Sequence, residues 1–250
     1  MKDKIQIVVL AAGYGKRMNN CELPKVLIPF NGKPIISHLL AAIKESDVCL
    51  KPVIVVGQKA YQVQEALGPD YIYIFQKEQL GTGHAVLVTK PSLKGKAENI
   101  MILYGDHPLV TATMIKKLAT AHLASKKVLT MATVKVADFL DWRGNFYDFG
   151  RIIRNDSSQV CQIIEKRDAS LEQKEIKEVN PGYYCFQAEW LWANLDKLKN
   201  TNSQQEYYLT DLVDLACRQG QEIATVEIEP KEALGVNTAD QLALAEGMCK

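Results

Sequence analysis

Short apolar, β-branched segments alternate with helical patterns along the first half of the chain. The apolar runs predict strands at residues 5–10, 53–56, 71–75 and 100–104. Apolar residues at helical spacing predict helices at residues 35–44, 59–67 and 84–89. Because alternating strands and helices form βαβ units, this pattern predicts a mostly parallel sheet. Such a sheet binds ligands at the carboxyl ends of its strands. We therefore expect the ligand-binding residues just after Leu10, Phe75 and Tyr104.

The pattern changes in the second half, after a helix predicted at residues 111–125. Strands are predicted at residues 128–136, 150–154 and 159–165, and a polar turn joins the last two into a hairpin. A strand at residues 183–186 is followed by helices at residues 189–198, 208–217 and 238–248. No repeat, low-complexity segment or flexible linker divides the chain. We therefore expect a single α/β domain over residues 1–250: a Rossmann-like, mostly parallel sheet flanked by helices, with an inserted β-hairpin.

The composition is that of an ordinary globular protein with almost no net charge. Of the 250 residues, 47% are hydrophobic and 24% are charged, which excludes the disordered, collagen-like and coiled-coil classes. The 30 basic and 29 acidic side chains leave a net charge of +1, so no overall field attracts nucleic acid or an anionic membrane. An anionic ligand must therefore be bound by a local cluster of charges.

Cysteine spacing and apolar run lengths bear on the cellular location. No C-x-x-C pair occurs, which predicts neither a zinc site nor a disulfide framework. The cysteines are Cys21, Cys49, Cys161, Cys185, Cys217 and Cys249. No apolar run approaches the ~20 residues of a membrane span, and the apolar start is too short for a signal peptide and contains Gln6. We expect a cytoplasmic protein with free thiols; the sequence makes no prediction of its oligomeric state.

A glycine loop with basic residues follows the first predicted strand. It reads Leu10-Ala11-Ala12-Gly13-Tyr14-Gly15-Lys16-Arg17-Met18, and Pro24-Lys25 comes shortly after. Its glycines allow backbone N–H groups to converge on an anion, while Lys16, Arg17 and Lys25 supply positive charge. A dinucleotide fingerprint would need glycine in place of Met18, and a Walker A loop would need Ser or Thr in place of Arg17. The loop indicates a triphosphate cradle, although such a loop on its own is more often an ordinary strand-to-helix turn.

Further polar motifs fall where the sheet would bring them to the same edge. They are Gln76, QLGTGHA at 79–85, YGDHPL at 104–109, FGRI at 149–152, IEKRDA at 164–169, NPG at 180–182, EYYLTD at 206–211 and GVN at 235–237. Together with the glycine loop, and in this order over nearly the whole chain, they resemble the uridylyltransferase domain of the bacterial N-acetylglucosamine-1-phosphate uridylyltransferase family. The loop alone resembles those of sugar-phosphate, molybdopterin and methylerythritol-phosphate nucleotidylyltransferases.

The resemblance implies a role for residues in both halves of the chain. It implies that the nucleotide-binding part, residues 1–110, holds UTP through Leu10, Ala11, Ala12, Gly13, Gly15, Gln76, Gly81 and Thr82, with uracil at the last three. It implies that residues 111–250 form the sugar-binding part and the closing helices. The sugar-binding positions are Tyr104, Gly150, Glu165, Asn180, Tyr208 and Thr210. By the same resemblance Asp106 and Asn237 bind Mg²⁺, Asn237 also contacts substrate, and Arg17 and Lys25 are catalytic.

The residue types suit these roles on chemical grounds as well. The amide of Gln76 both donates and accepts hydrogen bonds, as a nucleobase edge requires. Asp106 follows an apolar strand and a glycine, so we expect an exposed carboxylate at a strand end, where Mg²⁺ bridging phosphates can use it. Taken singly, a glutamine after a strand is more often an ordinary surface residue, and Asp106 suits a helix N-cap ahead of Pro108 equally well.

The implied reaction is attack of N-acetylglucosamine 1-phosphate on the α-phosphorus of UTP, which forms UDP-N-acetylglucosamine and pyrophosphate. The attacking phosphate oxygen is already anionic, so alignment and charge neutralisation are needed rather than a general base. Alternatives are another amino sugar 1-phosphate or another NTP, and a catalytically silent UDP-sugar sensor. A metal-dependent glycosyltransferase normally carries Asp-x-Asp, and here Asp106 is followed by His107-Pro108. We expect small-molecule substrates and neither a nucleic-acid nor a membrane partner.

The chain departs from the family pattern beside the expected sugar site. His107 stands where the family usually has a small apolar residue, Pro181 stands where it has Thr, and residues 141–148 do not match. These changes bear on which sugar is bound. Arg151 and Lys166 are expected to be paired surface charges, unless they lie beside bound phosphates.

Other notable residues are interpreted as structural. His38 and His122 fall in helical patterns and are expected to be exposed or capped, His84 is expected to pack after the glycine turn, and Trp190 and Trp192 form faces of an amphipathic helix. The sequence ends without the hexapeptide repeats of bifunctional family members. We therefore expect neither acetyl-CoA use nor a trimer imposed by a β-helix.

Overall fold

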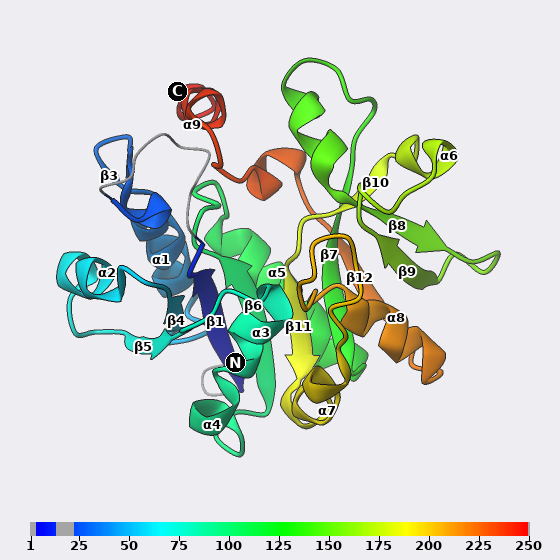
Figure 1. The fold of residues 1–250 in the computed structure, drawn as a ribbon, viewed down its shortest axis with the longest axis horizontal. Coiled ribbons are helices and arrows are strands. Elements are labelled where there is room, and N and C mark those ends of the chain that lie inside the picture. Colours follow the sequence, from blue (N-terminus) through cyan, green and yellow to red (C-terminus); the bar gives the residue numbers. More distant parts are fainter. Residues whose placement is uncertain (1–3, 14–22, 250) are drawn as a thin grey trace.

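The computed structural model describes residues 4–13 and 23–249, which form the elements drawn in Figure 1. The strands are β1 (Ile5–Ala11), β2 (Pro29–Phe30), β3 (Lys33–Pro34), β4 (Val53–Val56), β5 (Ile72–Phe75), β6 (Asn99–Tyr104), β7 (Leu129–Lys135), β8 (Gly150–Arg154), β9 (Val160–Ile164), β10 (Glu178–Asn180), β11 (Tyr184–Gln187) and β12 (Ala224–Glu227). The α-helices are α1 (Ile35–Ser46), α2 (Ala60–Leu67), α3 (Thr82–Leu87), α4 (Lys90–Leu93), α5 (Ala112–Ser125), α6 (Leu171–Lys174), α7 (Ala188–Asn194), α8 (Asp211–Arg218) and α9 (Ala239–Gly247). Short 3₁₀ helices are η2 (Lys25–Leu27), η3 (Asp141–Asp148), η4 (Leu195–Lys197) and η5 (Pro230–Ala233).

One large sheet crosses the molecule, with β5 at one end and the β8–β9 hairpin at the other (Figure 1). Its strand order is β5-β4-β1-β6-β11-β7-β10-β8-β9, and β12 pairs with β7. The strands β5, β4, β1 and β6 are parallel, whereas β11 lies antiparallel between β6 and β7. Helices cover both faces of this sheet, so the predicted α/β fold class is confirmed.

Strand β1 shows why the sheet is buried on both faces. Side chains alternate across a strand, and apart from Gln6 both sets here are apolar and at most 8% exposed. Ile7 and Val9 pack in one cluster with α1, α2 and α5. Val8 and Leu10 pack in the other with α3, α4, α7 and α8. The strand therefore holds the start of the glycine loop, residues 10–13, at a fixed edge of a three-layer core.

The strands and helices predicted in the first half are present, and so is the β8–β9 hairpin, which is antiparallel. The helix predicted at residues 189–198 is α7 followed by η4. Strands β10 and β12 are additions that the pattern did not indicate. β10 has three residues and Val179 as its one apolar side chain, and β12 places Thr225 and Glu227 at the surface. Among the described residues, no helix is long and apolar enough to cross a bilayer.

The expectation that His122 is exposed is wrong. It lies on α5 and is 2% exposed. Its Nδ1 lies 2.9 Å from Thr130 Oγ1 on β7 and its Nε2 lies 3.0 Å from Asn99 Oδ1 on β6. Burial lowers the pKa of His122 to about 4, because a charged ring would lose its hydration there. The ring is thus a neutral link between helix and sheet.

Acidification should destabilise the protein through His122. Its pKa is below the ordinary 6.5 in the folded state, so its contribution to stability is complete above about pH 6.5 and is lost as the pH falls towards 4. Urea unfolding at pH 7.5 and at pH 4.5 gives the loss of unfolding free energy on acidification. We expect this loss to be about 2 kcal/mol smaller in His122→Gln than in the wild type. Equal acid sensitivity of the two proteins would contradict this assignment.

Candidate active site

Two connected hollows open at the carboxyl ends of β1 and β6, where the motifs were expected to meet. The smaller, about 410 Å³, is lined among others by Leu10, Ala11, Ala12, Gly13, Lys25, Gln76, Gly81 and Thr82. The larger, about 690 Å³, is lined among others by Gly150, Glu165, Asn180, Tyr208 and Thr210. Thr82, Tyr104, Asp106 and Glu206 line both hollows, so they form one site. Gly15 and Arg17 lie outside the described residues.

The amide of Gln76 lies in the smaller hollow just after β5. Gln76 is 3% exposed, and its Nε2 lies 3.1 Å from His84 Nδ1 and 3.4 Å from Gly81 O. Gly81 has a φ of +108°, and a Cβ there would lie 2.6 Å from Tyr207 O. Only glycine fits this approach, which leaves a narrow recess with an amide in its wall. Such a recess suits a flat, polar ring.

Backbone hydrogen bonds tie this recess to the other half of the site. Tyr207 N donates to Leu80 O at 2.8 Å, and Gly83 N donates to Tyr207 O at 2.8 Å. Leu209 N donates to Thr82 Oγ1 at 3.0 Å. The segment that carries Tyr208 and Thr210 is therefore held against the start of α3, and the two hollows keep a fixed relation.

Polar groups converge in the larger hollow. Glu165 Oε1 accepts from Thr210 Oγ1 at 3.2 Å. Asn180 Nδ2 donates to Tyr184 Oη at 2.7 Å, and its Oδ1 accepts from Gly182 N at 3.0 Å. Burial raises the pKa of Glu165, and the Thr210 hydrogen bond opposes that change. A carboxyl group, an amide and hydroxyls together match the needs of a ligand with many hydroxyls.

Two tyrosine hydroxyls of the site stay protonated at neutral pH. Burial, with added repulsion from Glu165, raises the pKa of Tyr104 and raises that of Tyr208 to about 12. Both hydroxyls can therefore donate as well as accept hydrogen bonds. This dual capacity is what pairing with sugar hydroxyls requires.

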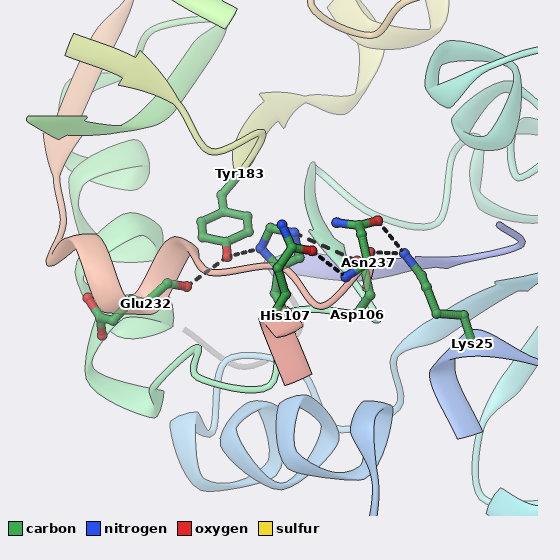
Figure 2. A network of polar contacts seen from close by, with 7 residues as sticks. Lys25, Asp106, His107, Tyr183, Glu232 and Asn237 are labelled. Carbon is green, nitrogen blue, oxygen red and sulfur yellow. Dashed lines mark hydrogen bonds and ion pairs between the residues drawn. The ribbon is translucent and has the colours of Figure 1, made fainter. Parts of the chain in front are cut away.

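Asp106, Lys25 and Asn237 meet at the junction of the hollows. Figure 2 shows the Lys25 side chain reaching both other residues. Its Nζ forms an ion pair with Asp106 Oδ2 and donates to Asn237 Oδ1 at 2.9 Å. Burial would raise the pKa of Asp106, but attraction to Lys25 and the Lys25 hydrogen bond outweigh it, so the pKa lies below its ordinary value. Asp106 is thus an ionised carboxylate.

The structure corrects two expectations for Asp106. Its side chain is 13% exposed rather than open to solvent, because it is packed with Lys25 and His107. It is also not a helix N-cap: helix α5 is capped by Thr111, whose side chain accepts from Met114 N at 3.1 Å. The carboxylate is therefore left to face Lys25 and the site.

Arg151 is neither a surface charge nor a phosphate ligand. It is fully buried and donates to the backbone carbonyls of Tyr147, Phe149 and Lys174. Its guanidinium carbon also lies 4.8 Å from the ring centroid of Phe139. Arg151 therefore holds segments around η3 and α6 together, and the expectation of a surface pair is wrong. Lys166 does form a surface ion pair, with Asp148.

Some residues of the site were not singled out from the sequence. Gln79 donates from Nε2 to Ala12 O at 2.5 Å, which fixes the strand end before the glycine loop. Glu206 lines both hollows. Tyr183 is fully buried and contacts His107. Gln79 and Glu206 belong to the quoted motifs, so their position beside assigned residues was a usable signal; Tyr183 gave none, because its partners are distant in sequence.

Comparison with known families decides the class of this site. Residues 7–205 match the MobA-like NTP transferase domain. The chain belongs to this family. The matched region includes Asp106, Lys25 and the described start of the glycine loop, all of which line the site. The expected reaction class, nucleotidyl transfer, is confirmed.

Individual relatives match nearly the whole length of this chain. The bifunctional protein GlmU of Desulfotalea psychrophila is 39% identical over 249 residues, which cover 98% of this chain and 70% of that protein. GlmU of Brevibacillus brevis is 41% identical over 251 residues, which cover 99% of this chain and 52% of that protein. The resemblance indicated by the motifs is confirmed. The chain spans only about half the length of several of these relatives.

Solved structures support the fold. UDP-glucose pyrophosphorylase complexed with UDP-glucose superposes with a TM-score of 0.78 at 16% identity, covering 98% of both chains. The inositol-1-phosphate CTP transferase from T. maritima superposes with a TM-score of 0.71 at 17% identity, covering 99% of this chain and 96% of that one. At these identities the likeness establishes the shared α/β architecture.

Proposed function

We propose that this chain transfers the uridylyl group of UTP to N-acetylglucosamine 1-phosphate, forming UDP-N-acetylglucosamine and pyrophosphate. A phosphate oxygen of the sugar phosphate forms the new bond to the α-phosphorus, and the bond from that phosphorus to the pyrophosphate oxygen breaks. The observation that supports this most is the meeting of an amide recess and a hydroxyl-binding hollow at Lys25 and Asp106. The reacting phosphates would lie at this junction.

The two hollows divide the substrates between them. UTP would place uracil against Gln76, Gly81 and Thr82 and its phosphates along residues 10–13. The sugar would lie among Tyr104, Gly150, Glu165, Asn180, Tyr208 and Thr210, whose polar groups could pair with its hydroxyls. Holding both substrates in line supplies much of the rate enhancement, because the nucleophile needs no deprotonation. The division of the chain at about residue 110 into nucleotide and sugar parts is part of this proposal.

Asp106 and Asn237 fit a divalent cation, and we propose Mg²⁺. A lysine ammonium already lies between the Asp106 carboxylate and the Asn237 amide oxygen, so this pair of oxygens accepts a positive charge. Mg²⁺ prefers oxygen ligands and often takes only one or two from protein. Among residues 4–13 and 23–249, no cluster of three His, Cys, Asp or Glu side chains offers another metal site. The ion would neutralise phosphate charge and keep the phosphates aligned.

Lys25 and Arg17 are the proposed catalytic cations. Lys25 lies at the junction of the hollows, and its ammonium can turn from Asp106 towards a phosphate when that carboxylate is otherwise paired. There it would stabilise negative charge on the transferring group. Arg17 would act in the same way on the leaving pyrophosphate.

A matrix of four NTPs against several sugar 1-phosphates, followed by pyrophosphate release, tests this function. We expect UTP to be preferred, and kcat/KM for N-acetylglucosamine 1-phosphate to exceed that for glucosamine 1-phosphate and glucose 1-phosphate at least about tenfold. A site that hydrogen-bonds the acetamido group loses those bonds with either analogue. Preference for another sugar or NTP would contradict the named substrates, and binding of UDP-sugar without turnover would identify a sensor.

A further inference from the structure

The buried imidazole of His107 lies at the back of the active site between two tyrosine rings. His107 is 8% exposed. Its ring is stacked on Tyr104, with centroids 5.5 Å apart, and meets Tyr183 edge-on at 5.4 Å. Gly182 also contacts Tyr104, because a Cβ at Gly182 would lie 2.6 Å from the Tyr104 ring. Tyr104, which lines both hollows, therefore contacts both the His107 ring and a glycine backbone.

A hydrogen-bond chain fixes the orientation of this imidazole (Figure 2). His107 Nδ1 lies 2.5 Å from Tyr183 Oη, and Tyr183 Oη donates to Glu232 O at 2.8 Å. The tyrosine has one proton, and a carbonyl oxygen only accepts, so all three groups are satisfied when Nδ1–H donates to Tyr183. The Nε2 edge then faces Asp106, whose Oδ1 is 3.7 Å away.

The same edge of the ring supports the segment that carries Asn237. A Cβ at Gly235 would lie 2.6 Å from His107 Nε2, so the Gly235 backbone rests directly on the imidazole. Val236 N, one residue on, donates to Asp106 O at 2.9 Å. Asn237 follows and accepts from Lys25. The position of the ring thus sets how closely the segment 235–237 approaches Asp106.

We propose that His107 is a positioning residue that fixes the separation of Asp106 and Asn237, the two oxygen ligands of the proposed cation site. It contacts both sides of the pair: Asp106 is its chain neighbour, and Gly235 rests on its ring. The bond to Tyr183 anchors the ring to the carbonyl of Glu232, which lies in η5 just before segment 235–237. A shift of the ring would therefore change the spacing of the two ligands.

This inference rests on the proposed function, because it assigns His107 to the metal–nucleotide part of that site. A merely structural histidine would affect stability alone. A positioning residue would weaken the cation-dependent part of UTP binding and leave the cation-independent part intact. The two roles can therefore be separated without turnover.

Calorimetric titration measures UTP affinity in the absence of any sugar phosphate. One titration contains Mg²⁺ and the other contains EDTA, and the difference between them is the cation-dependent part of UTP binding. In His107→Val and Tyr183→Phe we expect the Mg²⁺-dependent gain in UTP affinity to shrink about tenfold, while the affinity in EDTA changes less than about twofold. We expect the double variant to be no worse than His107→Val, because Tyr183 acts through the same ring. Tyr183→Phe removes one oxygen atom, so it serves as the test if His107→Val fails to fold.

His122→Val is the matched control. His122 is also a buried, doubly hydrogen-bonded histidine, but its partner Asn99 lies at the start of β6, away from the carboxyl end that carries Asp106. We expect it to lower the melting temperature and leave both UTP affinities unchanged. The inference would be overturned if the Mg²⁺-dependent gain in UTP affinity were as large in His107→Val and Tyr183→Phe as in the wild type. It would also be overturned if the wild type showed no such gain. Pyrophosphate release from UTP by the wild type decides separately on the proposed function.

Discussion

Replacing Asp106 by Asn should abolish nearly all nucleotidyl transfer while the protein stays folded. The amide keeps the shape of the carboxylate and can still accept from Lys25, so packing changes little. It removes the negative charge that would hold the cation against two polyanionic substrates. We expect kcat to fall at least about a thousandfold, or roughly 4 kcal/mol in the activation free energy, with saturating substrates. Pyrophosphate release measures the rate.

Asp138→Asn is the control for this substitution. Asp138 also pairs with a cation, Arg143 at 2.7 Å, and its pKa is likewise below the ordinary value, chiefly through the Arg143 hydrogen bond. It does not line either hollow. Asp138→Asn should therefore turn over like the wild type. Near wild-type kcat in Asp106→Asn would remove Asp106 from the metal role.

Replacing Lys25 by Met should lower turnover more than it weakens UTP binding. An ammonium that faces the transferring phosphate interacts most strongly when charge develops there. We expect kcat to fall about a hundredfold, roughly 2.7 kcal/mol, and the dissociation constant of UTP to rise less than tenfold. Steady-state kinetics and direct UTP titration give the two numbers.

Lys135→Met provides the comparison for Lys25. Lys135 is an exposed lysine at the end of β7, and it pairs with Glu227 at 2.9 Å. Glu227 lies on β12, which pairs with the edge of β7 opposite to β11. Loss of this charge should change neither kcat nor UTP binding. Equal losses in UTP binding and kcat/KM with kcat unchanged would instead identify Lys25 as a uniform binding residue.

The parts of the fold and site predictable from the sequence are those with a local signal. The parallel strands read as apolar runs because they are buried on both faces, as β1 shows. Residues 10–13 of the glycine loop and Asp106 were placed correctly at one edge because strand direction fixes where each strand's carboxyl end lies. Their roles in binding and catalysis stay predictions until the variants are measured.

Other features depend on contacts that no local pattern carries. Nothing in the sequence around Arg151 distinguishes it from a surface arginine. In the structure it is buried and donates to backbone carbonyl groups of two separate segments. His122 lies in a helical pattern, and its burial is set by Asn99 and Thr130 on two strands. The link from His107 through Tyr183 to Glu232 joins positions far apart in the chain. Only tertiary packing brings such partners together, so the sequence interpretation missed them.

The most direct test of the proposed activity follows a radioactive α-phosphate from UTP into the product. Purified protein would be incubated with UTP carrying ³²P at the α-phosphate, N-acetylglucosamine 1-phosphate and Mg²⁺, and the products would be separated. We expect the label to appear in UDP-N-acetylglucosamine, with one pyrophosphate released per molecule formed. Label that remains in UTP here, while a parallel incubation with another NTP or another sugar 1-phosphate releases pyrophosphate, would contradict the proposed substrates, and no transfer with any pair would contradict enzymatic function itself.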